Sequence, residues 1–150
     1  AIGRRMPAVG VWRHRLLIGL EVFELVGALV GTVGLLRDGY EFMGRTVETS
    51  ELPFGSWVPA GVALLLLNGI VPAVAVGLDR RRHRLARTAH LATGVVLMAW
   101  IVLQVAVIGL VFVLQPVMFA VGAAITALAA SEPGRDDGRR SGEAPTAVDP

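Results

Sequence analysis

The sequence predicts an all-α membrane protein, a bundle of four transmembrane helices. Four apolar stretches, at about 16–36, 57–78, 89–110 and 111–130, are each close to the roughly 20 residues that a helix needs to cross a hydrocarbon core. Hydrophobic residues make up 54% of the 150 positions and do not alternate with polar ones, which excludes membrane-spanning strands. Because lipid offers no partner to open backbone groups, helices are the spanning structure that remains.

The charged residues give a further observation. All 14 basic residues are arginines, and they collect beside the apolar stretches. Membrane topology requires this arrangement, so the net charge of +2 predicts no nucleic-acid partner. The chain has no cysteine, which excludes disulfides, thiol redox chemistry and thiolate metal sites.

The first stretch, 16–36, is predicted to be a retained helix and not a cleaved signal peptide. It is longer than the core of a typical signal peptide, it contains Glu21 and Glu24, and it lacks a clear A-x-A cleavage site. Residues 1–15 are predicted to form a cytoplasmic segment before a helical domain at 16–130.

The second stretch, 57–78, contains two informative prolines. Ser56 can cap the helix, and Pro59 fits its first turn, where a backbone amide has no intrahelical partner. Pro72 lies in mid-span and removes the donor for the carbonyl oxygen of Asn68, so we expect a kink there.

The third and fourth stretches are joined almost without a linker. Gly109 and the Gln115–Pro116 pair are the candidate turn residues and predict a tight helical hairpin, although Pro116 interrupts the fourth stretch. Small residues four apart predict packing faces between helices. These are Gly27 and Gly31; Gly69, Ala73 and Gly77; and Gly122, Thr126 and Ala130.

The positive-inside rule predicts the orientation of the helices. Five arginines fill the link at 79–87, whereas the loop at 37–56 has two arginines against four acidic residues. We therefore expect both termini and the 79–87 link to face the cytoplasm of a bacterial plasma membrane, with the 37–56 loop outside. Residues 131–150, rich in Gly, Pro, Ser and charge, are predicted to be a disordered cytoplasmic tail.

The basic link has a candidate role of its own. Arginines near a membrane surface can bind anionic lipid headgroups, at about 1 kcal/mol each. The alternative is that the link only fixes the topology. The residues concerned are Arg80, Arg81, Arg82, Arg84 and Arg87.

Two acidic residues within the first stretch are the main candidates for a functional site. Glu21 and Glu24 lie three apart, hence on one face of the helix, which Gly27 and Gly31 extend. Ionisable residues inside a membrane are costly and point to function.

The depths of other polar residues predict partners for these carboxyl groups. Counted at ~1.5 Å per residue, Glu24 matches Asn68 in depth and Glu21 matches the stretch at 90–93. We expect a hydrogen bond between Glu24 and Asn68. For Glu21 the expected partner is His90, Thr93 or Arg87.

The predicted intramembrane polar site comprises Glu21, Glu24, Asn68, His90 and Gln104, the last on one helix face with Trp100. Three interpretations stay open: hydrogen bonding between helices, a proton or cation site, and a site for a lipid or ligand head group. No nucleophile motif, phosphate loop or HExxH pattern occurs, so no catalytic residue and no enzyme activity is predicted. The three histidines, His14, His83 and His90, form neither a haem pair nor a metal cluster, so no cofactor or metal is predicted.

Several short motifs carry a resemblance to a known group. They are Leu20-Glu21, Pro53-Phe54, Val58-Pro59-Ala60-Gly61, Arg81-Arg82-His83, Trp100 with Val102 and Gln104, Ile108-Gly109, and Leu114-Gln115-Pro116. Over about 16–130 the chain resembles small four-helix integral membrane proteins of high-GC Gram-positive (actinobacterial) bacteria. The resemblance implies a location and a fold, with no activity attached.

A second resemblance is to the small multidrug resistance transporters, which pack four short helices and use a glutamate of the first as a shared proton and cation site. Glu21 or Glu24 would take that role. The longer outer loop and the tail depart from that family, and its aromatic motifs have no match here.

Two hypotheses of function follow. The first is an accessory or assembly subunit of a membrane complex, with the lipid bilayer, other membrane-protein subunits or a second copy of the chain as partners. The alternative is a small proton- or cation-coupled transporter that uses Glu21 and Glu24.

Overall fold

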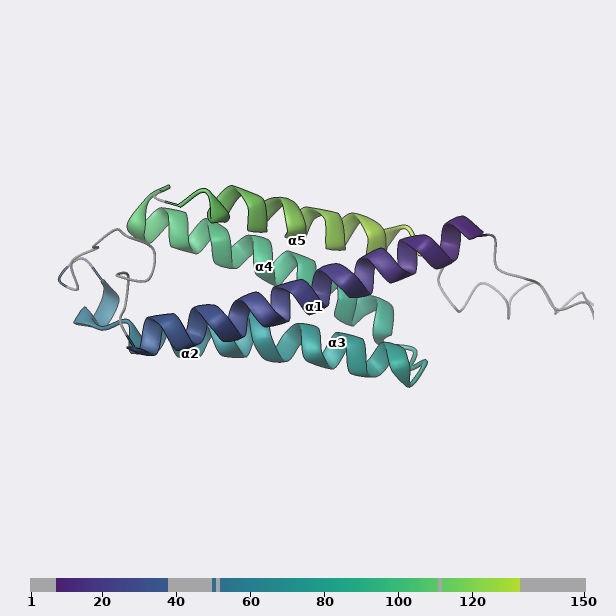
Figure 1. Cartoon of the computed structure of the whole chain (residues 1–150), viewed down its shortest axis with the longest axis horizontal. Helices are drawn as coiled ribbons and strands as arrows, with labels where there is room; N and C mark the ends of the chain where they lie inside the picture. Colours follow the sequence, from purple (N-terminus) through teal and green to yellow (C-terminus); the bar gives the residue numbers. More distant parts are fainter. Residues whose placement is uncertain (1–7, 38–49, 51, 111, 133–150) are drawn as a thin grey trace, which may run out of the picture.

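The computed structural model describes residues 8–37, 50, 52–110 and 112–132 and is built from helices (Figure 1). Within these residues there is no strand. The elements are α1 (Ala8–Arg37), the 3-10 turn η3 (Pro53–Gly55), α2 (Val58–Leu65), the π-helical η4 (Leu66–Ile70), α3 (Val71–Arg80), α4 (Ala86–Ile108) and α5 (Leu114–Ala130).

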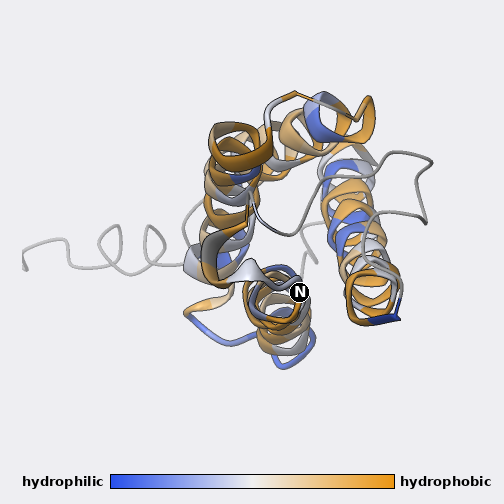
Figure 2. Ribbon diagram, turned by 90° about the vertical axis from the view of Figure 1, so that its left-hand side faces the viewer, coloured by the Kyte–Doolittle hydropathy of each residue, from blue (hydrophilic) through white to orange (hydrophobic). Residues whose placement is uncertain are grey.

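Among the described residues, three helical segments are long and apolar enough to cross a membrane: Val9–Arg37, Val58–Arg80 and Ala86–Ile108. The fourth, α5, is also apolar but has only 17 residues. The all-helical prediction is confirmed, and these segments indicate a membrane protein. Hydrophobic residues cover most of every helix (Figure 2).

The first helix begins earlier than predicted. It starts at Ala8, so 8–15 belong to α1 and do not form a separate segment. The predictions for 1–7, for most of the 37–56 loop and for the tail beyond 132 lie outside the described residues.

The helices run antiparallel, so that one end of the bundle gathers three chain segments: the start of α1, the α3–α4 turn and the end of α5 (Figure 1). The helix α1 crosses the bundle diagonally. Near its start, Leu17 packs with Ile125 and Ala129 of α5. Near its other end, Thr32 donates a hydrogen bond to the carbonyl oxygen of Gly61 in α2, 3.3 Å away. The helices α1 and α5 therefore diverge along the bundle.

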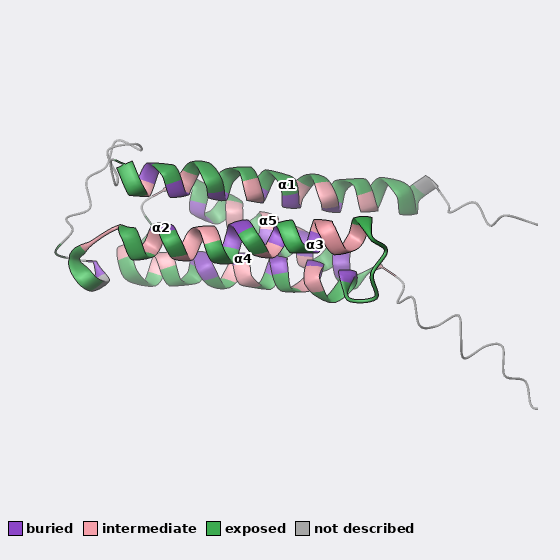
Figure 3. Cartoon of the chain, turned by 90° about the horizontal axis from the view of Figure 1, so that it is seen from below, coloured by how far each residue is buried: buried purple, intermediate pink, exposed green. Residues whose placement is uncertain are grey.

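The inward face of α1 is a single buried stripe (Figure 3). Its members are three or four residues apart, the spacing that places side chains on one face of a helix. They are Leu17, Glu21, Glu24, Ala28 and Thr32. The face of the two glutamates thus continues through Ala28. Gly27 and Gly31 line the same cavity as Glu24, as predicted, although Gly27 is itself exposed.

Just before Pro72 the helix contains a π-helical turn, and the kink expected there stays a prediction. The segment Leu66–Ile70 is π-helical and is followed at once by the helix that contains Pro72. Because proline has no amide hydrogen, the carbonyl oxygen of Asn68 loses its α-helical donor. A π-turn accommodates such a break within a continuous helix, and here it holds the Asn68 side chain in the interior.

The hairpin between α4 and α5 uses the predicted turn residues. Gly109 has φ 77°, a conformation that glycine adopts without steric cost. Gln115 bridges the turn: its Nε2 donates to the carbonyl oxygen of Gly109 at 3.2 Å, and its Oε1 accepts from the amide of Phe112 at 3.2 Å. Pro116 lies in the first turn of α5, where its missing amide costs nothing, so it does not interrupt this helix.

Glycines allow α4 and α5 to touch. A Cβ atom on Gly94 would lie 2.6 Å from the carbonyl oxygen of Gly122, and one on Gly122 would lie 2.9 Å from the carbonyl oxygen of Gly94. The predicted packing role of Gly122 is confirmed, and Gly94 joins it. The prediction fails at Gly27 and Gly77, where an added Cβ would meet nothing within 4 Å.

Candidate functional site

A fully buried hydrogen-bonded pair joins α1 to α4. His90 Nδ1 lies 2.7 Å from Oε1 of Glu21, and both side chains are 0% exposed. Of the three partners expected for Glu21, His90 is thus the one that the structure supplies. Thr93 donates to the carbonyl oxygen of Ala89 in its own helix.

The pair is the inner end of a line of titratable groups. His90 Nε2 is 3.7 Å from Oδ1 of Asp79, and Oδ2 of Asp79 is 3.1 Å from Nε2 of His14. His14 Nδ1 in turn lies 3.0 Å from Oε1 of Glu132. The side chain of His14 is 41% exposed, so the line runs from the surface at one end of the bundle to the buried Glu21.

Asp79 reaches this position because of the way that α3 ends. The amide of Arg82 donates to the carbonyl oxygen of Asp79 at 2.8 Å, and the amide of His83 donates to that of Leu78 at 2.9 Å. These two bonds form a Schellman motif, with Arg82 in the left-handed conformation at φ 52°. Asp79 is thereby fixed in the last turn of α3, between α1 and α4.

Two arginines hold the end of α5 beside this line. Arg87 donates to the carbonyl oxygens of Ala129 and Ala130, at 3.3 and 3.0 Å, and Arg13 donates to the hydroxyl of Ser131. Cations at a helix C-terminus stabilise it through the exposed carbonyl groups. Arg87 is therefore engaged with α5 and is not the partner of Glu21.

The other arginines of the link are exposed: Arg80, Arg81, Arg82 and Arg84. Their exposure is compatible with headgroup contact, which stays a prediction.

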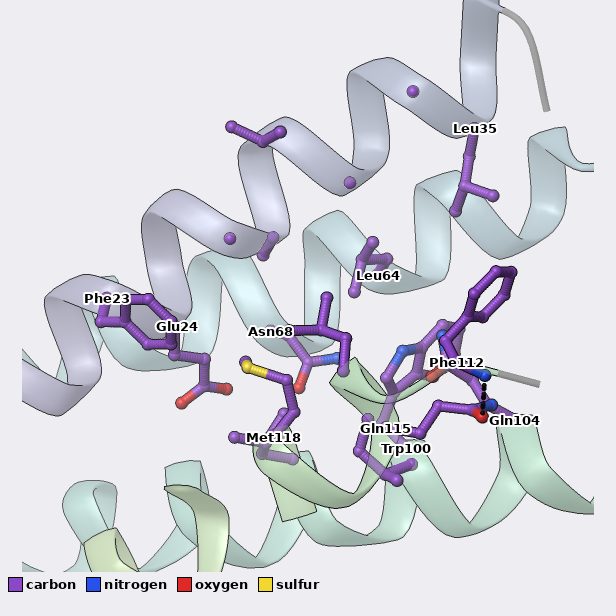
Figure 4. A pocket seen from close by; sticks show the side chains of 18 residues that line it. Phe23, Glu24, Leu35, Leu64, Asn68, Trp100, Gln104, Phe112, Gln115 and Met118 are labelled. Atoms are coloured by element: carbon purple, nitrogen blue, oxygen red, sulfur yellow. Dashed lines mark hydrogen bonds between the residues drawn. The ribbon is translucent and has the colours of Figure 1, made fainter. Parts of the chain in front are cut away.

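Glu24 and Asn68 meet in a cavity of about 320 Å³ between α1, η4, α4 and α5 (Figure 4). Both side chains are 1% exposed. The predicted hydrogen bond between them is absent: within the described residues, neither oxygen of Glu24 and neither amide atom of Asn68 has a hydrogen-bond partner. The depth argument correctly placed both residues at one cavity, but no hydrogen bond joins them.

The walls of the cavity are mostly apolar. Leu97, Ile101 and Met118 line it, together with the ring of Trp100, whose Nε1 is also without a partner among the described residues. Gln104 lines it as well, which places it with Glu24 and Asn68 as predicted.

The cavity reaches the outer surface of the bundle. Phe23 and Val30 line it and are also 52% and 51% exposed. The cavity beside Glu24 is therefore open at the side of the bundle.

Known proteins give no guide to this arrangement. Comparison with protein-family models, with curated proteins and with solved structures found no match. Among the described residues, no group of three or more His, Cys, Asp or Glu side chains is placed to hold a metal ion.

The sequence analysis did not identify the titratable groups nearest the surface. His14, Asp79 and Glu132 are far apart in the chain and meet only because three helix ends coincide. One signal was present: Asp79 is the single acidic residue at the edge of a link otherwise filled with arginines. The third histidine, His83, accepts a hydrogen bond from the amide of Leu85 within the turn.

Proposed function

We propose that this protein is a small membrane carrier that binds a lipophilic amine at Glu24 and exchanges it for a proton. One observation carries the proposal: both carboxyl oxygens of Glu24 are buried beside a cavity with no hydrogen-bond partner among the described residues. A carboxylate in such surroundings is strongly destabilised unless a proton or a cation neutralises it. A proton and an ammonium group would therefore compete for the same side chain, which is the basis of an exchange.

The lining of the cavity suits an amine with an apolar body. The ammonium group can donate to Glu24 and to the side-chain oxygen of Asn68, and the ring of Trp100 offers a π face to a cation. A volume of about 320 Å³ lies at the small end of the range for ligand sites, which favours a compact molecule.

The orientation is part of the proposal. The start of α1, the arginine-rich α3–α4 turn and the end of α5 lie at one end of the bundle (Figure 1). The positive-inside rule favours the cytoplasmic side of a bacterial plasma membrane for this end. The α4–α5 turn would then face outward.

The accessory-subunit hypothesis gives no occupant to the cavity, and for this reason the geometry favours the carrier. The accessory-subunit hypothesis makes a separate prediction: a stoichiometric partner co-purifies with the chain from native membranes in mild detergent. Such a partner, with a helix seated against Phe23 and Val30, would cover the cavity and replace the carrier proposal.

The test uses Trp100 as a reporter of ligand binding. Trp12→Phe and Trp57→Phe leave Trp100 as the remaining tryptophan, and the protein is placed in lipid nanodiscs. Its fluorescence is titrated with phenylbutylamine, phenylbutanol and phenylbutyrate, which share an apolar body and differ in the charge of the head group. We expect saturable binding of the amine only.

The matched variant is Glu24→Gln, which keeps the shape of the side chain and removes its charge. Because hydrogen bonds to charged groups contribute about 1.5–3 kcal/mol, amine binding should weaken by roughly 10- to 100-fold. Glu132→Gln, at the bundle end, is the control and should bind as the parent does. Equal binding of the amine and the alcohol, or an unchanged affinity in Glu24→Gln, would refute the proposal.

A further inference from the structure

We propose that His14, Asp79, His90 and Glu21 form a proton path from the aqueous surface at the α3–α4 turn to the cavity at Glu24. The inference rests on the proposed exchange at Glu24 and names the route by which its proton arrives. Its basis is geometric: titratable groups from α1, α3 and α4 follow one another from a half-exposed histidine to a fully buried carboxyl.

The surface end of the path is His14. Its ring is 41% exposed and can take a proton from water, and its two nitrogens face Asp79 of α3 and Glu132 beyond α5. The cations nearby are engaged elsewhere, Arg13 with Ser131 and Arg87 with the last carbonyl groups of α5. Two carboxyl groups thus face the ring, one at each nitrogen.

The first transfer runs from His14 to Asp79. With both ring nitrogens protonated, Nε2–H of His14 donates to Oδ2 of Asp79 across 3.1 Å. Movement of this proton converts the imidazolium and the carboxylate into a neutral imidazole and a carboxylic acid, so the two opposite charges cancel and the net charge is unchanged. Asp79 is fixed in the last turn of α3, but its carboxyl group is free to turn about its own bond.

The second transfer passes through His90. Oδ1 of Asp79 is 3.7 Å from His90 Nε2, which is buried without a hydrogen-bond partner among the described residues. Rotation of the protonated carboxyl group brings its O–H to this nitrogen. As Nε2 gains a proton, Nδ1 releases one to Oε1 of Glu21 across 2.7 Å. Asp79 is again a carboxylate, Glu21 is an acid, and His90 has changed tautomer; ring rotation restores the starting form.

The last step joins the two glutamates of α1. Glu21 and Glu24 lie three residues apart, about 4.5 Å along the helix axis, on the same buried stripe. Oε2 of Glu21 is buried with no partner among the described residues, as are both oxygens of Glu24. A proton on Glu21 is thus next to the group that binds the amine, and its arrival there releases the ligand.

The charged groups around His90 are those that the proposed path uses or lie close to it. Glu21 approaches from α1, Asp79 from α3, and Glu132 acts from beyond the end of α5. The remaining neighbours on α4 are uncharged apart from Arg87, which is engaged with α5. If the only role of His90 were to hold α1 against α4, its contact with Glu21 through Nδ1 would be enough. The structure also places Asp79 near Nε2 of His90, and His14 beside Asp79, as a path requires.

The test follows the proton on Glu24 directly in the full chain. Protein in lipid nanodiscs is subjected to a rapid drop in pH, and time-resolved infrared spectroscopy records the carbonyl stretch of protonated carboxyl groups. The band absent from Glu24→Gln reports Glu24. Asp79→Asn keeps the shape of its side chain and cannot relay a proton, and His90→Gln keeps a donor to Glu21. His83→Gln, an exposed histidine of the same turn, is the control.

We expect Asp79→Asn and His90→Gln to slow the protonation of Glu24 by roughly 100-fold, while His83→Gln matches the wild type. Phenylbutylamine binding at high pH should be retained in Asp79→Asn, which shows that the variant is folded. Wild-type rates in Asp79→Asn would overturn the path. If that variant protonates normally and still binds the amine, the path fails but the carrier stands. If the amine does not bind the wild-type protein, the carrier fails, and the rates alone decide whether the path exists.

Discussion

The imidazole of His90 and the carboxyl group of Glu21 meet at 2.7 Å in the interior of the bundle, although 69 residues separate them in the chain. The contact fixes the register between α1 and α4, because a shift of either helix by one turn would leave both groups unpaired. The pair lies between two polar regions. On one side, Asp79 and His14 lead to the surface, and on the other side is the cavity at Glu24.

Removal of one member of this pair should destabilise the bundle. His90→Ala leaves the Glu21 carboxyl group buried without its hydrogen-bond partner, and an unsatisfied buried polar group costs about 1–3 kcal/mol. Thermal unfolding in mild detergent, followed by circular dichroism, should show a large fall in the melting temperature. His83→Ala is the matched control and should leave it unchanged. Equal melting temperatures for the two variants would show that the pair contributes nothing to stability.

The contact between α4 and α5 predicts a strong effect at Gly94. A Cβ atom there would lie 2.6 Å from a backbone oxygen of Gly122, which cannot move aside as a flexible side chain could. Gly94→Ala should therefore cost about 1–3 kcal/mol by forcing the helices apart. Gly27→Ala, where nothing lies within 4 Å, is the control and should be tolerated. Titration with a denaturing detergent gives the free energy of unfolding of each of the two variants. A neutral Gly94→Ala would contradict the close approach.

The end of α3 predicts a stabilising substitution. Arg82 has φ 52°, and a left-handed conformation costs a non-glycine residue about 1–2 kcal/mol. Arg82→Gly should thus raise the melting temperature. Arg81→Gly removes an arginine from the same turn at φ −82° and should not raise it. A lower melting temperature in Arg82→Gly would show that the arginine side chain outweighs the backbone strain.

The exposed arginines of the α3–α4 turn predict retention of anionic lipid. Replacement of Arg80, Arg81 and Arg84 by glutamine should reduce the phosphatidylglycerol that stays bound during purification, at about 1 kcal/mol for each arginine lost. Native mass spectrometry counts the bound lipids. Arg15→Gln, on α1, is the control for a general loss of charge. Unchanged lipid occupancy in the triple variant would leave the turn a topological signal only.

Much of the fold could be predicted because hydrophobic length and proline and glycine chemistry are local properties. The helices and the turn at Gly109 and Gln115 both follow from short segments of sequence. The start of α1 at Ala8 was missed because a hydropathy pattern marks the lipid-exposed part of a helix, and this helix extends beyond it.

The candidate site could be predicted only in part. Counting residues along each predicted helix correctly placed His90 beside Glu21, and Asn68 at the same depth as Glu24. This works because residues at similar depth lie close together in parallel or antiparallel helices. Such counting could not show that a cavity lies beside Glu24 and Asn68 and that no hydrogen bond joins the two side chains. The contacts of Asp79 with His14 and His90 depend on how three helix ends meet, which no local pattern encodes.

The proposed exchange requires that Glu24 present a titratable carboxyl group to a cavity open at the side of the bundle, where an amine can replace its proton. A lipophilic carbodiimide, which modifies protonated carboxyl groups in apolar surroundings, tests this requirement directly when peptide mass spectrometry locates the adduct. We predict modification of Glu24, with Glu21 protected by His90, and a loss of the adduct when phenylbutylamine is present but not when phenylbutanol is. An unmodified Glu24, or an adduct that the amine does not reduce, would contradict the account.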